Sequence, residues 1–456
     1  MKILFASTAA DGHFNPMTGV AIHLRDAGND VRWYTGASYG RRLQEMGIPH
    51  YPFKRAREIN GDTMITLFPK RARLKGPALI RFDFEQVFIS NVEAYFEDVQ
   101  EIDRDFSFDV LVAEGAWMAA RLVKEVMRRQ VIGIGPGTLL ATSPDVPPNF
   151  VGLRPARTSA GRLVHRAMGA AMDRMVTANG RRLYNAVMTK HGLEPITGSV
   201  FDEFCSYHDV LFQNGVPGFE YPRRRQPPKV RFVGLLRPYS TRSAAIPPQL
   251  TSIGEERRVV LISQGTIDNH EPGKLIVPAL EGLLPSGALL IVGTGRKNTE
   301  ELRRRFPQEN VVIEDYIDFE AVLERADVFV CNGGHGSVLL SLSKGVPVVG
   351  AGVREGKNDI NARVEHFGVG INLHTETPTA SQVARGVERV LKNLSFRRRA
   401  QELRDELALY HPLEIIDEYF AREVKAGPAR QFDHRRDTNQ SDRDHTIGAP
   451  AVAKIS

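Results

Sequence analysis

The sequence contains few cysteines and no long apolar run. Only two cysteines, Cys205 and Cys331, occur among its 456 residues, and their separation matches no zinc-binding spacing. This excludes a disulfide-rich scaffold and favours a reducing compartment. No stretch reaches the ~18 consecutive apolar residues that a membrane-spanning helix needs, and the N-terminal apolar run is too short for a signal peptide. We therefore expect a cytoplasmic protein.

The sequence also lacks a motif that reads nucleic acid. Its formal net charge is +6 and its pI about 9.2, but no reader motif accompanies the basic residues, so a nucleic-acid partner is not expected. An anionic small ligand fits the same charge. The length and the 42% of hydrophobic residues are typical of two globular domains.

Short apolar runs alternate with helical patterns in the first half of the chain. Strands are predicted at residues 2–7, 30–36, 108–115 and 131–136. A helix is predicted after the first strand, with Asn15 as its N-cap and Pro16 in its first turn. Strands that alternate with helices indicate parallel βαβ units.

The second half repeats this alternation. Strands are predicted at residues 257–266, 287–295, 310–316, 327–334 and 346–352. The sequence therefore predicts an α/β protein with two doubly wound, Rossmann-like domains that face each other across a cleft.

Composition suggests where the domains divide. We expect an N-terminal domain at residues 1–240 and a C-terminal domain at 241–427, because the Pro- and Arg-rich stretch before residue 250 is typical of a linker. Residues 155–195 form a basic helical insertion, either a solvated face or a weak peripheral membrane contact. Residues 428–456 are polar and are predicted to be disordered.

A histidine follows the first strand in the stretch "ADGHFNP". His13 either caps the next helix or acts as a base, and the stretch itself carries no phosphate-binding fingerprint. The first half alone does not distinguish these two interpretations.

The stretch "CNGGHGS" predicts an anion site between a strand and a helix. Three glycines allow close approach of a ligand, and the helix start offers free N–H groups. Ser337 is predicted to cap this helix and to donate its hydroxyl to a phosphate. A tight turn with a capping serine is the alternative. The candidate residues are Asn332, Gly334, His335, Gly336 and Ser337.

Two further strand-end loops carry polar residues. Gly265 and Thr266, in "SQGT", would complete a diphosphate cradle. Glu355, Asn358 and Asp359, in "GVREGKND", are candidates to bind the hydroxyls of a sugar. For the second loop, a solvated turn is nearly as good an explanation.

Together these motifs resemble those of the inverting UDP-glycosyltransferases of GT-B fold, which include macrolide and plant natural-product glycosyltransferases. The resemblance rests on "GH.NP", "S.GT", "DY", "ADVFV..GG.GS", "GVPVVG" and "NARV", which occur in the family's order and extend to about residue 425.

The resemblance implies roles for single positions. His13 matches the catalytic base, and Glu114 matches the carboxylate that orients it. Tyr316 and Ile317 match the segment whose backbone meets the nucleotide base. Lys357 and Asn358 fall where the family often has an acidic residue and a glutamine that hold the sugar.

Three positions depart from the family pattern. Asn332 stands where many members have a histidine, and Glu114 is one methylene longer than the usual aspartate. The missing acid–glutamine pair leaves the sugar open, with Glu355 or Asp359 as substitutes for the acid. Asp11 is the alternative to Glu114 as the group that orients His13.

These features lead to a functional prediction. We expect metal-independent, inverting transfer of a hexose from a nucleotide-diphosphate sugar, with UDP favoured, to a hydroxyl of a hydrophobic small-molecule or lipid acceptor. The sugar nucleotide is a co-substrate, and no cofactor or metal site is expected. Phe14, Trp117 and Met118 are predicted to line the acceptor site. The protein is expected to be a monomer or a homodimer.

Two other functions fit the same fold. A UDP-sugar epimerase would act on the sugar nucleotide without an acceptor. A non-catalytic nucleotide-binding partner of another transferase would explain the departures at Asn332 and Glu114.

Overall fold

The computed structural model describes residues 1–240, 246–252, 254, 256–265 and 268–424. Residues 1–413 form one compact unit, and the remaining residues are assigned to a second one. The predicted tail at 428–456 and the middle of the predicted linker, 241–245, lie outside the described residues.

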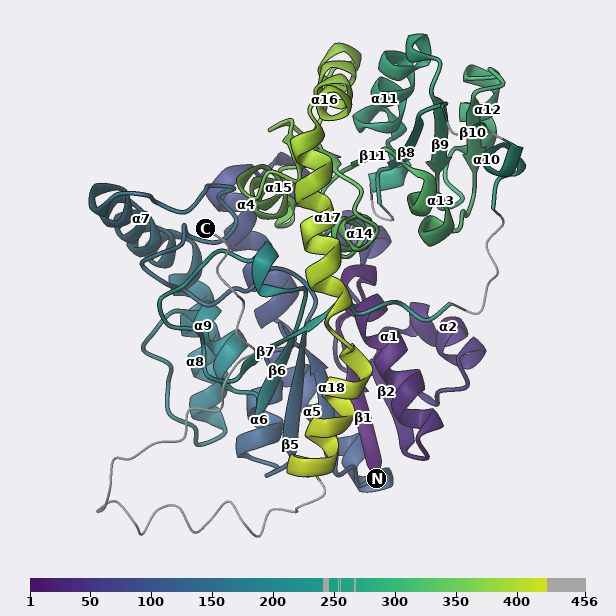
Figure 1. Ribbon diagram of the computed structural model, residues 1–456. Coiled ribbons are helices and arrows are strands. Elements are labelled where there is room, and N and C mark those ends of the chain that lie inside the picture. Colours follow the sequence, from purple (N-terminus) through teal and green to yellow (C-terminus); the bar gives the residue numbers. More distant parts are fainter. Residues whose placement is uncertain (241–245, 253, 255, 266–267, 425–456) are drawn as a thin grey trace. The chain divides into compact units, whose positions relative to one another are not determined.

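The N-terminal half contains a parallel sheet of seven strands in the order β3-β2-β1-β4-β5-β6-β7 (Figure 1). Strands β4 and β6 are buried along their whole length, and β1 and β5 are buried except at their first residue, as expected for a parallel sheet covered on both faces. Their bounds are β1 Lys2–Ala6, β2 Asp30–Thr35, β3 His50–Pro52, β4 Val110–Glu114, β5 Gln130–Gly135, β6 Val210–Asn214 and β7 Val230–Gly234.

Helices connect the strands of this half. They are α1 Asp11–Asp26, α2 Gly40–Glu45, α3 Gly61–Leu67, α4 Gly76–Asp83, α5 Val92–Asp105, α6 Ala120–Glu125, α7 Ser159–Met172, α8 Ala178–Lys190 and α9 Val200–Ser206, with π-helical turns η3 Phe84–Ile89 and η4 Asp173–Thr177. Apolar side chains of α5, α6, α8 and α9 form one core cluster with the strands. The predicted helical insertion corresponds to α7, η4 and α8.

The C-terminal half contains a second parallel sheet, of six strands in the order β10-β9-β8-β11-β12-β13. The strands are β8 Val259–Ser263, β9 Leu289–Gly293, β10 Val311–Glu314, β11 Val328–Cys331, β12 Val348–Gly350 and β13 Gly370–Asn372. The helices are α10 Pro248–Ser252, α11 Ile276–Leu283, α12 Thr299–Arg305, α13 Phe319–Arg325, α14 His335–Ser343, α15 Lys357–His366, α16 Ala380–Lys392, α17 Leu394–Ala408 and α18 Pro412–Tyr419.

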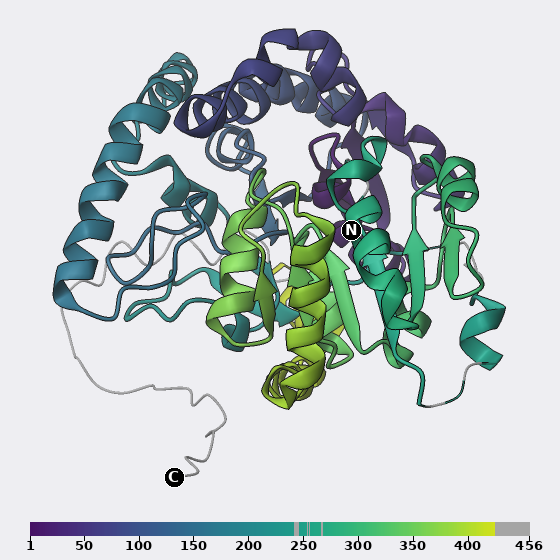
Figure 2. The same ribbon diagram turned by 90° about the horizontal axis from the view of Figure 1, so that it is seen from above.

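Helices cover both faces of the second sheet (Figure 2). One core cluster joins the strands to α11, α12 and α16, and the other joins them to α13, α14, α15 and α17. The prediction of two doubly wound, Rossmann-like sheets is therefore confirmed. We retain the division at residue 240 as a proposal.

Each sheet has one point at which the strand order reverses. In the first sheet this point lies between β1 and β4, and in the second it lies between β8 and β11. The loops that leave the carboxyl ends of such a strand pair diverge, and ligands of open α/β sheets bind in the crevice between them. A ligand site is therefore expected at these two loop pairs.

Candidate functional site

At the switch point of the first sheet, a histidine meets a buried carboxylate. Helix α1 follows β1, and His13 lies in its first turn, whereas Glu114 is the last residue of β4. His13 Nδ1 lies 2.9 Å from Glu114 Oε2. Because β1 and β4 are paired side by side, with Ala6 opposite Ala113, residues far apart in sequence meet here.

The surroundings of Glu114 fix its position. The side chain is fully buried, and its Oε2 accepts a hydrogen bond from the Ala116 backbone N–H at 2.8 Å. The Thr8 hydroxyl lies 3.5 Å from Oε1. A buried carboxylate with such partners stays in place, so it can hold the imidazole in one orientation.

The contact changes the acidity of His13. Burial opposes protonation of the ring, but the charge of Glu114 and its hydrogen bond outweigh burial, and the pKa of His13 is raised above its ordinary value of 6.5. With Nδ1 engaged by the carboxylate, Nε2 is the nitrogen left to accept a proton. The side chain keeps 26% of its surface exposed, so an acceptor hydroxyl can reach it.

Helix α1 begins earlier than predicted. Its first residue is Asp11, and Pro16 lies inside the helix instead of at its start. Proline cannot donate to the carbonyl four residues back, so α1 lacks the hydrogen bond from residue 16 to the Gly12 carbonyl. The consequence is that His13 is a helical residue, held by the bond from its N–H to the Ala10 carbonyl.

Asp11 does not orient His13. Its carboxylate accepts from Arg42 at 2.9 Å and from the Tyr39 hydroxyl at 3.2 Å. The structure therefore contradicts the alternative in which Asp11 holds the imidazole, because Glu114 makes that contact instead.

The three predicted acceptor residues lie in the core. Phe14 is fully buried and contacts the rings of Trp33 and Tyr39, with centroids 4.4 Å apart in each pair. Trp117 and Met118 are also buried, within the cluster under α5 and α8. The prediction that these residues line an acceptor surface was wrong for this conformation. For Phe14, the position next to His13 was misleading, because consecutive helical residues point about 100° apart.

A different aromatic residue lies beside His13. The Phe88 ring, in η3, has its centroid 6.1 Å from that of His13, and it is only half-buried. Phe88 could not be predicted from the sequence, because the contact joins segments 75 residues apart and π-helical turns have no distinct pattern.

The loop after β11 forms the start of helix α14. Strand β11 ends at Cys331, Gly334 occupies the N-cap position, and the helix begins at His335. Ser337 does not cap the helix as predicted. Its hydroxyl donates to the Gly334 carbonyl at 2.9 Å, so the first N–H groups of α14 remain available to an anion.

Asparagine side chains tie this loop to its neighbours. Asn332 is buried and its amide donates to the Gln264 carbonyl, next to Gly265. Asn361, also buried, donates to the Gly352 carbonyl at 3.0 Å. These contacts join the loops after β8, β11 and β12 at the second switch point. The predicted residue Thr266 lies outside the described residues.

Gly333 is required by this arrangement. Its φ is +87°, and a Cβ atom there would lie 2.5 Å from the Asn361 amide. Both the backbone conformation and the space therefore favour glycine. Asn361 was not predicted as a site residue, although it is the asparagine of "NARV".

His335 differs from His13 in its contacts. Its Nε2 lies 3.1 Å from the Asn214 carbonyl, and its Nδ1 is buried without a hydrogen-bond partner among the described residues. Burial lowers the pKa of His335 to about 4. The neutral ring then donates from Nε2, and Nδ1 keeps a lone pair.

The segment predicted to meet the nucleotide base contains one exposed ring and one buried side chain. Tyr316 is 45% exposed, and the Arg296 guanidinium lies 5.1 Å from its ring centroid. Ile317 is buried against Gly293 at the end of β9. A flat base could stack on an exposed ring of this kind.

The predicted sugar residues are divided between two environments. Glu355 is partly exposed and pairs with Lys357 at 3.1 Å. Asp359 instead accepts from the backbone N–H groups of Phe150 at 2.5 Å and Gly152 at 2.7 Å. Asn358 donates to the Phe150 carbonyl at 2.7 Å.

These contacts correct the assignment of Asp359. Its carboxylate is buried, with both oxygens engaged by backbone, so in this conformation it fastens residues 150–152 to α15. A partner more than 200 residues away cannot be read from the sequence. Glu355 is the better placed of the two candidate acids.

A buried ion cluster lies behind α15. Arg363 pairs with Glu220 at 2.6 Å, and Arg223 pairs with the same oxygen at 3.2 Å. The charges of the two arginines outweigh burial and lower the pKa of Glu220. Because Arg363 lies in α15, its ion pair with Glu220 holds this helix in place. Nothing in the sequence pattern indicated it.

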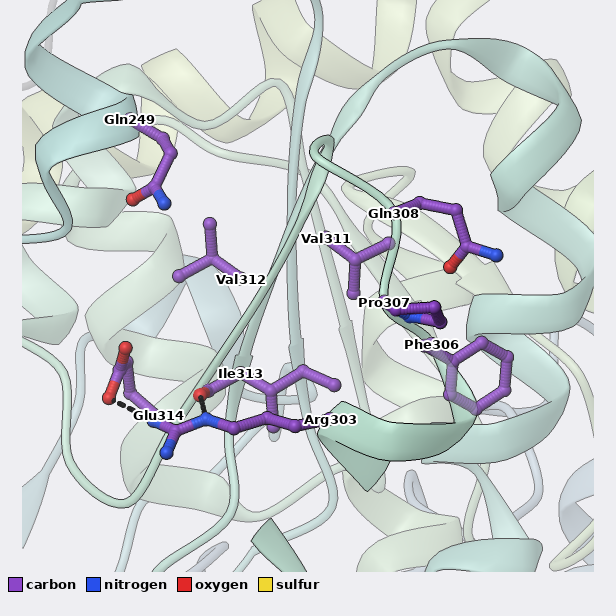
Figure 3. Close-up of a pocket in the computed structure, with 9 residues that line it drawn as sticks. All are labelled: Gln249, Arg303, Phe306, Pro307, Gln308, Val311, Val312, Ile313 and Glu314. Carbon is purple, nitrogen blue, oxygen red and sulfur yellow. Dashed lines mark hydrogen bonds and ion pairs between the residues drawn. The ribbon is translucent and has the colours of Figure 1, made fainter. Parts of the chain in front are cut away.

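One cavity of the structure lies elsewhere. Its volume is about 270 Å³, and it lies against β10, the edge strand of the second sheet (Figure 3). Its charged groups satisfy each other, because Arg303 donates to Glu314 at 2.6 Å and to the Ile313 carbonyl at 2.8 Å. The cavity contains none of the predicted site residues.

Neither a metal-ligand cluster nor a membrane-spanning helix occurs in the part of the chain that the structure describes. No three His, Cys, Asp or Glu side chains in the described part of the chain gather as metal ligands do. No helix within the same residues combines the length and apolar character needed to cross a membrane.

Comparisons with known proteins identify the family of this chain. Residues 288–421 match the family described as erythromycin biosynthesis protein CIII-like, C-terminal domain. The chain is 33% identical over 413 residues to 4'-demethylrebeccamycin synthase of Lentzea aerocolonigenes, which covers 89% of this chain and 96% of that protein. It is 27% identical over 428 residues to UDP-glycosyltransferase 2 of Phaeomoniella chlamydospora, covering 91% and 94%.

A solved structure shows the same fold. The spinosyn rhamnosyltransferase SpnG complexed with thymidine diphosphate superposes with a TM-score of 0.65 at 16% identity, over 92% of this chain and 99% of that one. The chain belongs to the GT-B-fold UDP-glycosyltransferase family that includes the macrolide glycosyltransferases, and it is a glycosyltransferase.

Proposed function

We propose that the protein transfers a hexose from a nucleotide-diphosphate sugar to a hydroxyl of a hydrophobic small-molecule or lipid acceptor, with inversion and without a metal ion. The observation that carries this proposal is the pairing of His13 with the buried Glu114 at 2.9 Å. The pair lies at the switch point of one sheet, and the start of helix α14 lies at that of the other.

His13 is proposed to act as the general base. Its Nε2 takes the proton of the acceptor hydroxyl as the acceptor oxygen bonds to the anomeric carbon. Glu114 holds the ring through Nδ1 and stabilises the imidazolium that forms, as in other carboxylate–histidine pairs. Because the oxygen attacks opposite to the bond that breaks, one displacement inverts the anomeric centre.

The loop between Asn332 and Ser337 is proposed to hold the leaving group. The bond from the anomeric carbon to the diphosphate oxygen breaks, and its electron pair leaves with the diphosphate. The N–H groups at the start of α14, with Gly334, His335 and Gly336, would stabilise this charge. These donors supply the positive potential for which other enzymes use a metal.

The donor is proposed to be a UDP-sugar. Support comes from the name of the Phaeomoniella relative, a UDP-glycosyltransferase, although the SpnG structure holds thymidine diphosphate. Tyr316 and Ile317 would meet the base, and Gly265 with Thr266 would lie near the diphosphate. Glu355, Lys357 and Asn358 would lie near the sugar, with Glu355 as its acid.

The acceptor is proposed to bind on the N-terminal half, next to His13. The half-buried Phe88 ring supplies an apolar wall there. A hydrophobic acceptor would suit such a wall.

The test uses the purified chain with UDP-glucose, dTDP-glucose and a panel of aromatic hydroxylated acceptors, with and without EDTA. We expect a β-linked product from an α-linked UDP-sugar in both conditions. A retained anomer contradicts inversion, and a loss of activity that Mg²⁺ restores contradicts metal independence. Reaction of the sugar nucleotide alone to an epimer would favour the epimerase instead.

A further inference from the structure

Helix α7 presents an apolar face to solvent. Leu163 and Val164 are 63% and 55% exposed, and Met175, in the adjoining η4, is 62% exposed. None of the fourteen residues of α7 is buried. In Figure 1, α7 lies at the outer edge of the ribbon of the N-terminal half.

The exposed residues follow helical spacing. Ala160, Leu163, Val164, Ala167, Ala171 and Met175 are all exposed, and they recur at the intervals of three and four that place side chains on one helix face. Single exposed apolar residues need no explanation, and Leu394 and Leu409, each 77% exposed, are of that kind. A continuous apolar face is different, because it indicates a partner.

The flanks of this face are basic. Residues 154–182 contain seven arginines and one acidic residue, Asp173. The formal net charge of this segment is therefore +6, the same as that of the whole chain. Arg181 pairs with Asp173 at 2.7 Å, and Arg154 pairs with Glu365. Arg166 and Arg174 are exposed and make no ion pair within the described residues.

This combination defines the partner. An exposed apolar helix face with arginines beside it is the pattern of a helix that lies in the headgroup region of an anionic membrane. A second copy of the chain fits less well, because a two-fold contact through α7 would bring Arg166 and Arg174 of both copies together. We propose that the α7 surface, consisting of Leu163, Val164, Met175, Arg166 and Arg174, docks on an anionic lipid bilayer.

The proposal is tested by sedimentation of the full chain with vesicles. One vesicle is phosphatidylcholine alone, and the other contains about one third phosphatidylglycerol. We expect binding to the anionic vesicle only, and at least tenfold weaker binding in high salt. No binding, or equal binding to both vesicles, overturns the proposal.

Variants place the binding on α7. Leu163→Glu with Val164→Glu should weaken vesicle binding at least tenfold, and Arg166→Gln with Arg174→Gln several-fold. Leu394→Glu, on α17, is the matched control and should change nothing. Circular dichroism checks that each variant is folded. Unchanged binding of the Leu163/Val164 variant overturns the proposal.

A fluorescent residue gives an independent readout. Both native tryptophans, Trp33 and Trp117, are fully buried, so Leu163→Trp adds the one ring at the α7 surface. Its emission should shift to shorter wavelength on anionic vesicles. An unshifted emission, or a dimer by light scattering that the Leu163/Val164 variant abolishes, would contradict a lipid partner. Neither result bears on the proposed transfer reaction.

Discussion

Each sheet has a histidine in a helix that starts at its switch point, but the two histidines have opposite properties. His13 and His335 each lie in the first turn of the helix that borders a switch point. Glu114 raises the pKa of His13 despite burial, whereas His335, which meets only the Asn214 carbonyl, has a pKa lowered to about 4. The contacts that each ring makes therefore determine its chemistry.

The largest expected effect comes from removing the first histidine. His13→Ala should reduce transfer at least ~10³-fold, because no other described group at Glu114 can accept the proton. Binding of UDP, measured by calorimetry, should be unchanged, since the phosphate site is in the other sheet. His23→Ala, in the same helix, is the control. Turnover near that of the unmodified enzyme would refute the assignment of the base.

Breaking the pair at its carboxylate should have the next largest effect. Glu114→Gln keeps the side-chain size but removes the charge, so kcat should fall about 10²-fold with little change in the KM for the donor. Asp11→Asn is the matched control, because Asp11 bonds Arg42 and Tyr39 instead of His13. Equal effects of the two substitutions would mean that neither carboxylate orients the base.

A third substitution sharpens the role of the second loop. Gly333→Ala places a Cβ 2.5 Å from the Asn361 amide at a φ of +87°, which should cost about 2 kcal/mol of stability and weaken binding of UDP. Gly336→Ala, where no atom lies within 4 Å of the new Cβ, is the control for stability. Thermal unfolding with and without UDP measures both effects. An unchanged melting temperature for Gly333→Ala would contradict the packing described.

The smallest effect concerns the second histidine. Because burial lowers the pKa of His335 from 6.5 to about 4, the folded chain binds fewer protons than the unfolded chain between these pH values. Stability should therefore fall as the pH drops through this window. His335→Gln should make the melting temperature fall less steeply between pH 6.5 and 4. Parallel curves for the two proteins would exclude His335 as a contributor.

The sequence predicted the fold because its strands include short, mainly apolar runs such as β8 and β9, which are buried at every residue. Such runs fit only a sheet covered on both faces. The order of the strands did not follow from them, since periodicity carries no information on which strands are neighbours. The start of the first helix was also not predicted correctly. Asn15 and Pro16 have the pattern of a helix start, but both lie within α1.

The candidate site was predictable only where a motif carries it. The pairing of His13 with Glu114 came from the family resemblance, and the structure brings the two side chains together. Phe88, Asn361 and the Glu220–Arg363 pair were missed because their contacts join distant segments. Phe14 and Asp359 were misplaced for a related reason, since position next to a motif does not determine where a side chain points.

The central claim is that Glu114 makes His13 the base, and a pH profile tests it most directly. A base must be deprotonated to act, so kcat/KM should rise with pH to a plateau. The inflection should lie above 6.5 in the unmodified enzyme, because Glu114 raises the pKa of His13. In Glu114→Gln only burial remains, and the inflection should move below 6.5. The same inflection in both proteins would contradict the account.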